Sequence, residues 1–351
     1  MRSCVTGGVT RLTESGLSMV TWKLLGERPP LSAAEWHEEF QRYQQFPEFK
    51  MCELSMRVEF DQPGRLRRVS PAGVSKNQEI TLEEFKRIWW MEYAHRMWGR
   101  AIGAAFLLPA TVFWAKGWLS PPLKKRVLAF GTLIFLQGLM GWYMVKSGLE
   151  DRFKEQSDVP RVSQYRLAAH LGLAFVLYTL LLWSGLDLLL PAQTVAITGT
   201  AKTAARKFRW LAHSCKGTVF LTAISGAFVA GLDAGLVYNS FPKMADRWIP
   251  DDILAFSPAL RNVTENPTTV QFDHRVLGTT SLALVTSMWL WSRRLHLPPR
   301  AHMAATAAAI MIWTQRTGLQ ALRQGTKSVS VRVTLLFRGL AQSGTPGRRI
   351  T

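Results

Sequence analysis

A glutamate and a histidine stand at the start of the first strongly apolar stretch of the chain, in Met91–Arg100 (MEYAHRMWGR). Glu92 and His95 are three residues apart, so on a helix they share one face. The stretch that follows, 101–114, carries no charge. Ionisable groups where a helix enters a membrane are costly and often functional. A structural alternative is that Glu92 and Arg96 lie at the water interface and extend their polar ends into it. This stretch alone leaves both interpretations open.

The composition indicates the kind of protein that carries this pair. The chain has 351 residues, of which 48% are hydrophobic and 19% charged, with a net charge of +19. The basic residues lie in short loops between apolar blocks and in the C-terminal tail, which is typical of a polytopic membrane protein and argues against nucleic acid as the partner. Cys4, Cys52 and Cys215 are far apart in the sequence, so they predict neither a disulfide framework nor a zinc site.

The apolar blocks predict an all-α polytopic membrane protein with five full spans plus an incomplete sixth. Each of the five is long enough to cross a hydrocarbon core. A sixth apolar stretch begins at Ala301 and is interrupted at Gln315, too early to span. Capping boxes at Ser32–Glu35 and Thr81–Glu84 predict the starts of two helices. The expected spans are residues 86–116, 127–145, 165–190, 210–231 and 269–291.

The loops between these spans predict an orientation. Loops 116–126, 202–209 and 293–300 are almost purely basic, whereas loops 146–161 and 238–267 mix acids with bases. The positive-inside rule places the basic loops on the cytoplasmic or matrix side. The odd-numbered spans then enter from the outer side.

Three histidines lie within about two turns of the outer end of those odd-numbered spans, at similar expected depth: His95, His170 and His274. Two imidazoles at one depth on parallel helices are what a six-coordinate heme iron needs. The alternative is that neutral histidines hydrogen-bond between helices. Arginines near the same surface are candidates to meet heme propionates: Arg96, Arg166 and Arg275. The histidines expected on the inner side are bystanders: His213, His296 and His302.

An internal repeat divides the chain into two copies of one unit. Gln271–Gly278 (QFDHRVLG) matches Glu92–Gly99 (EYAHRMWG) at the glycine and the His-Arg pair. Ahead of each, Gly7–Leu17 parallels Gly226–Leu236 with the same spacing. The first copy has Glu92 where the second has Gln271, and a carboxylate can transfer protons whereas an amide cannot. This difference points to chemistry in the N-terminal site and to a structural or electron-relay role for the C-terminal one.

These residues resemble the eukaryotic heme A synthase family, cytochrome c oxidase assembly factors of the mitochondrial inner membrane. The most specific stretches are Tyr43–Phe49 (YQQFPEF) and Ala227–Met244 (AFVAGLDAGLVYNSFPKM). The resemblance covers roughly residues 6–314. The other matching stretches are Gly7–Val20, Phe40–Lys50, Thr81–Arg100, Gly141–Glu150, Pro160–Gly172, Leu221–Met244 and Phe256–Gly278.

The resemblance implies an enzyme that oxidises the C8 methyl group of heme O to the formyl group of heme A. It implies eight helices in two four-helix halves. In this sequence His95 and His170 would bind the substrate heme, Glu92 would serve catalysis, and His274 would hold a heme b. A ferredoxin-type electron donor, heme O synthase and self-association in the lipid bilayer are the implied partners.

The expected domains are an outer polar segment (1–85), an N-terminal bundle half with the substrate heme site (86–190), a C-terminal half with the heme b site (191–314), and a basic tail (315–351). The chain departs from the family pattern in three places. It lacks a presequence and a first helix, its segment Met51–Ile80 is unlike the family loop, and after Gln315 a basic tail stands where the family continues its helices. We therefore expect a truncated or alternatively spliced form. The alternative functions are a non-catalytic membrane b-type cytochrome, a heme-binding assembly factor without turnover, and an inactive truncated isoform.

Overall fold

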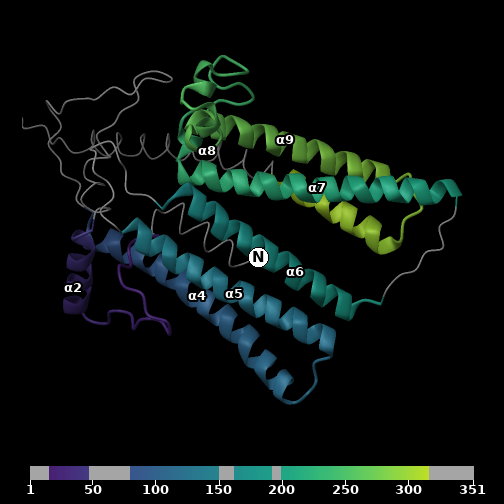
Figure 1. Cartoon of the computed structure of the whole chain (residues 1–351). Helices are drawn as coiled ribbons and strands as arrows, with labels where there is room; N and C mark the ends of the chain where they lie inside the picture. The colour runs from purple at the N-terminus through teal and green to yellow at the C-terminus, as the bar shows by residue number, and fades with distance from the viewer. Residues whose placement is uncertain (1–15, 47–79, 150–161, 192–198, 316–351) are drawn as a thin grey trace, which may run out of the picture. The chain divides into compact units, whose positions relative to one another are not determined.

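The computed structural model describes residues 16–46, 80–149, 162–191 and 199–315 (Figure 1). In these ranges the regular structure is helical, apart from one isolated β-bridge between Met244 and Arg247. Residues 299–315 are also helical. The other helices are α2 (Ala33–Gln44), α4 (Leu82–Ala115), α5 (Pro121–Gly148), α6 (Gln164–Leu189), α7 (Gly199–Gly231), η1 (Ala234–Leu236), η2 (Asp251–Leu254), η3 (Ala259–Arg261), α8 (Asn262–Glu265) and α9 (Pro267–Ser292).

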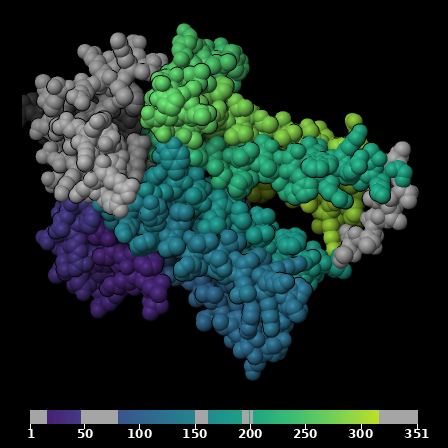
Figure 2. Space-filling model, viewed as in Figure 1, coloured from purple at the N-terminus to yellow at the C-terminus, as the bar shows by residue number. Residues whose placement is uncertain are grey.

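Four of these helices are long and apolar enough to cross a membrane: α4, α5, α6 and the part of α7 from Lys202 to Gly231. At most 17% of the residues in their apolar windows are buried within the chain. Large apolar side chains such as Leu108, Phe135 and Leu189 are therefore exposed, as lipid contact requires. Helices α4 and α5 form the blue surface in Figure 2. The all-α membrane fold is confirmed in the described residues.

Helix α9 covers the fifth expected span, with 26 residues, but does not belong to that group of four. Its first half carries Gln271, Asp273, His274 and Arg275, and these polar residues lower its hydropathy. The polar residues that make α9 a weaker span are therefore the ones expected to form a site.

Helix boundaries follow local sequence signals, except at the expected basic loops 116–126 and 202–209. Helix α5 begins at Pro121, so the prediction of a loop over residues 121–126 is wrong. Both expected capping boxes form, Ser32 with Glu35 ahead of α2 and Thr81 with Glu84 ahead of α4. The prediction of a basic loop over residues 202–209 is wrong, because α7 begins at Gly199 and is continuous through this stretch. Ala, Lys and Arg are strong helix formers, and no glycine or proline interrupts them there.

The chain divides into two compact units. The first contains residues 1–192 and 220–277, and the second contains 193–219 and 278–351. Every candidate site residue lies in the first unit. The second unit has its own apolar core, built from Cys215, Val285, Met288 and Ala305.

In the first unit, α5 packs against both α4 and α6, and α2 packs against α4 (Figure 1). An aromatic core joins α2 to the first turns of α4, with Trp36 and Trp89 edge to face at 5.2 Å between ring centroids. Met19 is buried in the same core, which is completed by Tyr43 and Phe85. This core places the segment around Met19 beside the part of α4 that carries Glu92.

Several expectations concern residues outside the described ranges. They are the first part of the N-terminal repeat (Gly7–Glu14), nearly all of Met51–Ile80, the end of loop 146–161, and the tail from residue 316 onward.

Candidate functional site

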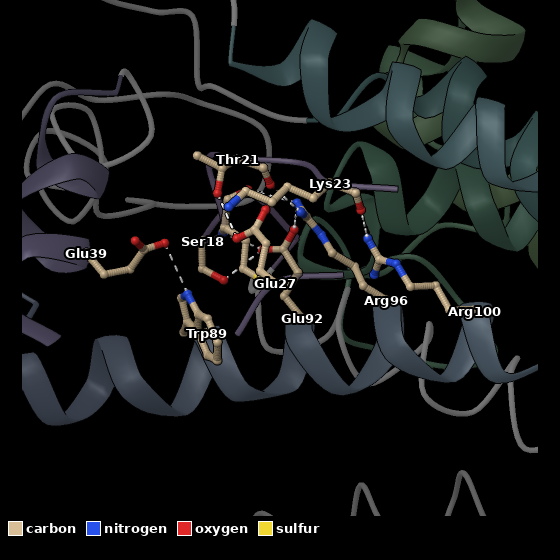
Figure 3. A network of polar contacts seen from close by, with 10 residues as sticks. Ser18, Thr21, Lys23, Glu27, Glu39, Trp89, Glu92, Arg96 and Arg100 are labelled. Atoms are coloured by element: carbon tan, nitrogen blue, oxygen red, sulfur yellow. Dashed lines mark hydrogen bonds and ion pairs between the residues drawn. The ribbon is translucent and has the colours of Figure 1, made fainter. Parts of the chain in front are cut away.

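The Glu92 carboxylate is buried, with 2% of the residue exposed, and accepts three hydrogen bonds. Ser18 donates through Oγ at 2.7 Å and Met19 through its backbone N–H at 2.8 Å, both to Oε2. Arg96, one turn further along α4, donates from Nη2 to Oε1 at 2.5 Å. Figure 3 shows Glu92 turned toward Ser18 and Arg96. Of the two interpretations left open by the sequence, the one in which Glu92 and Arg96 extend into the water interface is wrong, because the Glu92 side chain is only 3% exposed and that of Arg96 8%.

Arg96 also holds the segment that precedes α2. Its Nη1 donates to the Thr21 carbonyl at 2.7 Å and its Nη2 to the Met19 carbonyl at 2.8 Å. One turn further along, Arg100 donates to the carbonyls of Lys23 and Leu24 (Figure 3). We call residues 16–27 the N-terminal strap, because α4 binds it through these side chains.

The second copy of the repeat builds the same arrangement. Arg275 donates from Nη2 to the Tyr238 carbonyl at 2.8 Å and from Nη1 to the Ser240 carbonyl at 2.8 Å. In the repeat alignment Tyr238 corresponds to Met19, and Ser240 to Thr21. We call residues 235–243 the C-terminal strap. The two copies of the sequence repeat therefore also share the same hydrogen bonds between an arginine and the strap that precedes its helix.

The two straps differ where the sequence differs. Gln271 donates from Nε2 to the carbonyls of Tyr238 at 2.9 Å and Gly235 at 3.4 Å, whereas Glu92 accepts from its strap. The Oε1 atom of Gln271 is buried and has no hydrogen-bond partner among the described residues. The substitution of amide for carboxylate thus reverses the direction of the hydrogen bond and removes a buried charge.

A phenol and a carboxylate tie the C-terminal strap to the loop that follows it. The Tyr238 hydroxyl donates to Asp252 Oδ1 at 3.2 Å, and Asp252 Oδ2 accepts from Thr268 at 2.7 Å. Burial, with the nearby Asp252 carboxylate as the second cause, raises the pKa of the Tyr238 phenol. The neutral phenol is therefore the form that the fold favours.

His95 on α4 and His170 on α6 lie on two helices that both pack against α5. Two residues of α5, Gln137 and Gly141, lie against His170. Gln137 Nε2 lies 3.3 Å from His170 Nε2 and donates to the His170 carbonyl at 3.1 Å. Gly141, one turn along α5, faces the imidazole, and a Cβ there would lie 3.4 Å from His170 Cε1. The structure brings together the two histidines expected to bind one heme.

His274 on α9 lies against an equivalent pair of residues on α7, Ser225 and Gly226. Ser225 Oγ lies 2.8 Å from His274 Nδ1, and Ser225 also donates to the Thr222 carbonyl at 2.8 Å. A Cβ on Gly226 would lie 3.2 Å from His274 Cε1. His170 and His274 are therefore each supported by one polar side chain and one glycine of a neighbouring helix.

Arg166, the remaining candidate for a propionate, lies one turn before His170. It donates to Ser147 Oγ at 2.6 Å, and its guanidinium carbon lies 4.7 Å from the centroid of the Tyr143 ring. Among the described residues its contacts are with neutral side chains, whereas Arg96 pairs with Glu92 and binds a strap.

Sequence reasoning missed the supporting residues Gln137, Ser225 and Gly226 and gave Gly141 no individual role. Gln137 interrupts the uncharged stretch 127–145, where a polar amide is unusual, and this is the available signal. Ser225 and Gly226 resemble the ordinary small residues of membrane helices.

Comparison with known proteins gives a consistent result. The sequence profile of the COX15-CtaA family, described as cytochrome oxidase assembly protein, matches residues 3–63 and 67–329. The chain is 55% identical over 312 residues to heme A synthase COX15 of Homo sapiens, covering 89% of the chain and 69% of that protein. It is 56% identical to the Bos taurus protein of the same name, covering 89% and 68%. It is 43% identical to heme A synthase of Nitrosospira multiformis, covering 89% and 78%. No solved structure matches the chain significantly.

Proposed function

This multi-pass membrane protein belongs to the COX15-CtaA family of cytochrome oxidase assembly proteins, and we propose that it oxidises the C8 methyl group of heme O to a formyl group in the mitochondrial inner membrane. Its function is that of a heme A synthase, which is an oxidoreductase. The observation that carries this proposal is the placement of His95 and His170 on α4 and α6, which both pack against α5, with the buried Glu92 one turn from His95.

The residues present suit a heme. Imidazole is a common axial ligand of heme iron, and a bundle of helices can hold the flat apolar macrocycle. The glycine beside each of His170 and His274 leaves space that a Cβ would fill. We propose that His95 and His170 bind the substrate heme and that His274 binds a heme b, which supplies one-electron transfer when bound.

We propose different roles for the three arginines. Arg166 is the candidate to pair with a propionate, because its guanidinium contacts only neutral side chains in the described part of the chain. Arg96 and Arg275 already donate to strap carbonyls, so their first task is to fix the straps. A propionate at either of these would share a guanidinium that the fold uses.

We propose Glu92 as the catalytic carboxylate of the substrate site. Oxidation of a methyl to a formyl group releases protons, and a positioned carboxylate can accept one. The hydrogen bonds from Ser18 and Met19 and the ion pair with Arg96 hold this carboxylate in one orientation. Gln271 at the matching position cannot take a proton, which fits a cofactor site without proton transfer.

The family also suggests partners, which we include in the proposal. Heme O synthase would supply the substrate, a ferredoxin-type protein would exchange electrons, and the lipid bilayer would surround a possible homo-oligomer.

The test is turnover by the full chain, purified in detergent and supplied with heme O, with molecular oxygen as the oxidant and with a reduced ferredoxin system. Pigments are extracted and separated by chromatography. We expect heme A from the wild type and none from Glu92→Gln, with the heme content of Glu92→Gln unchanged. Glu83→Gln is the matched control, because it makes the same change at an exposed glutamate of the same helix, one that pairs with Lys86. We expect it to retain most of the activity.

Two outcomes would contradict parts of this proposal. A purified chain that holds only heme B and never forms heme A would be a non-catalytic b-type cytochrome. Loss of bound heme from Glu92→Gln would make Glu92 a structural residue that holds the N-terminal strap.

A further inference from the structure

The imidazoles of His170 and His274 are contacted at opposite nitrogen atoms. At His170 the neighbouring Gln137 amide meets Nε2, whereas at His274 the neighbouring Ser225 hydroxyl meets Nδ1. The chemistry of these contacts determines which nitrogen of each ring carries the proton.

The Gln137 amide is oriented by a backbone group. A carbonyl oxygen only accepts hydrogen bonds, so the Gln137 atom beside the His170 carbonyl must be the NH₂ group. That same NH₂ group lies against His170 Nε2, which must then accept. His170 therefore carries its proton on Nδ1, and the lone pair of Nε2 is directed at Gln137. The Nδ1 atom is buried and has no hydrogen-bond partner among the described residues.

The Ser225 hydroxyl is also oriented by a backbone group. It has one hydrogen, which it donates to the Thr222 carbonyl. Toward His274 it can only accept, so Nδ1 of His274 carries the proton. As in His170, the lone pair is on Nε2. In His274, however, the neighbouring side chain contacts Nδ1 and leaves Nε2 uncovered by it. A hydrogen bond of this kind, behind a metal ligand, fixes its tautomer and orientation and strengthens metal binding.

We propose that Gln137 is a removable cap on the iron-binding nitrogen of His170, and that Ser225 is a permanent support for His274. The proposal rests on the proposed function, in which His170 binds a heme that must enter and leave and His274 binds one that stays. Iron can reach His170 Nε2 only when the Gln137 amide withdraws from it. When heme leaves, the amide returns and satisfies the nitrogen that would otherwise be buried without a partner.

This arrangement affects the two sites in opposite directions. At His170 the cap competes with iron, so it lowers the affinity for heme and speeds release of the product. At His274 the support acts together with iron, so it slows release. Gln137 and Ser225 are positioning residues, since each acts through a histidine.

The experiment measures heme release from the full chain to an excess of a heme-scavenging apoprotein, followed by absorbance. His274→Ala and His170→Ala backgrounds assign the release phases to the two sites. Gln137→Met is nearly the same size as the native side chain and cannot donate a hydrogen bond. We expect it to slow release from the His170 site about fivefold, the value of one neutral hydrogen bond. Gln137→Leu repeats the test with a different shape.

Ser225→Ala provides the opposite test on the other helix. We expect it to speed release from the His274 site about fivefold and to leave the His170 phase unchanged. Faster release from the His170 site in both Gln137 variants, or no change, would overturn the cap. A wild-type chain that binds no heme at all would instead contradict the proposed function, so the two failures are distinguishable.

Discussion

Arg96 and Arg275 are bound in the same way: each guanidinium donates from its two terminal nitrogens to two carbonyls, spaced two residues apart, of the strap that precedes its helix. All four distances lie between 2.7 and 2.8 Å. A planar fork of donors suits such a pair of acceptors, and an ammonium does not.

We therefore expect Arg96→Lys and Arg275→Lys to loosen their straps although the charge is kept. Each should lower the free energy of unfolding by roughly 1–3 kcal/mol, since at least one hydrogen bond to a charged group is lost. Arg96→Lys should cost more, because Arg96 also binds the buried Glu92. Thermal unfolding in detergent and limited proteolysis of the straps would measure this. Equal stability of both variants and the wild type would show that the clamps contribute nothing.

Gln271→Glu tests the reversed hydrogen bond of the C-terminal strap. A carboxylate there would face the carbonyls of Tyr238 and Gly235 with no proton to donate. We expect a loss of roughly 1–3 kcal/mol in stability, because both hydrogen bonds to the strap carbonyls are lost and only Arg275, one turn further along α9, is placed to pair with the new charge. Glu92→Gln should cost less, since its amide oxygen can still accept from the Met19 N–H. If Gln271→Glu were as stable as wild type, the contact would not discriminate amide from carboxylate.

Gly226→Ala should disturb the His274 site specifically. The added Cβ would lie 3.2 Å from His274 Cε1, so the ring must move by a few tenths of an ångström and strain its contact with Ser225. Gly217→Ala on the same helix is the control, because no atom lies within 4 Å of its added Cβ. We expect Gly217→Ala to raise stability by roughly 0.5–1 kcal/mol. A changed heme spectrum and faster heme loss should appear in Gly226→Ala alone.

Alkaline pH should weaken the C-terminal strap through Tyr238. The pKa of its phenol is raised in the folded chain, first by burial and then by Asp252. The folded state thus holds its proton at a pH where the unfolded state, with a pKa of about 10, has lost it. This contribution to stability is complete below about pH 10 and is lost as the pH rises further. Tyr238→Phe should remove this part of the pH dependence, measured as unfolding temperature between about pH 8 and pH 11.

Much of the architecture could be predicted from the sequence because it depends on local signals. Capping boxes placed the starts of α2 and α4, and apolar length identified α5 and α6. The His-Arg repeat predicted two copies of one unit, and Arg96 and Arg275 make matching hydrogen bonds to their straps. The basic residues over 202–209 predict a loop, but α7 begins at Gly199, because Ala, Lys and Arg favour a helix.

The supporting residues could not be predicted, because their role depends on packing between helices. Gln137 meets His170 across 33 residues of sequence, and Ser225 meets His274 across 49. A pattern within one helix does not report which residue of a neighbouring helix faces it. The partners of Glu92 could not be predicted for the same reason, since Ser18 and Met19 precede α2 and lie 74 and 73 residues before Glu92 in the sequence.

The two straps also differ in the length of chain that separates them from the helix residues they contact. Ser18 and Glu92 are 74 residues apart, whereas Gln271 and the Tyr238 carbonyl are 33 apart. The entropy of closing a loop grows with its length, by about 0.6 kcal/mol for each doubling. The C-terminal strap therefore has the shorter and faster closure although the ribosome makes it later. Closing the N-terminal strap therefore costs about 0.7 kcal/mol more chain entropy, which the contacts of Glu92 and Arg96 must offset.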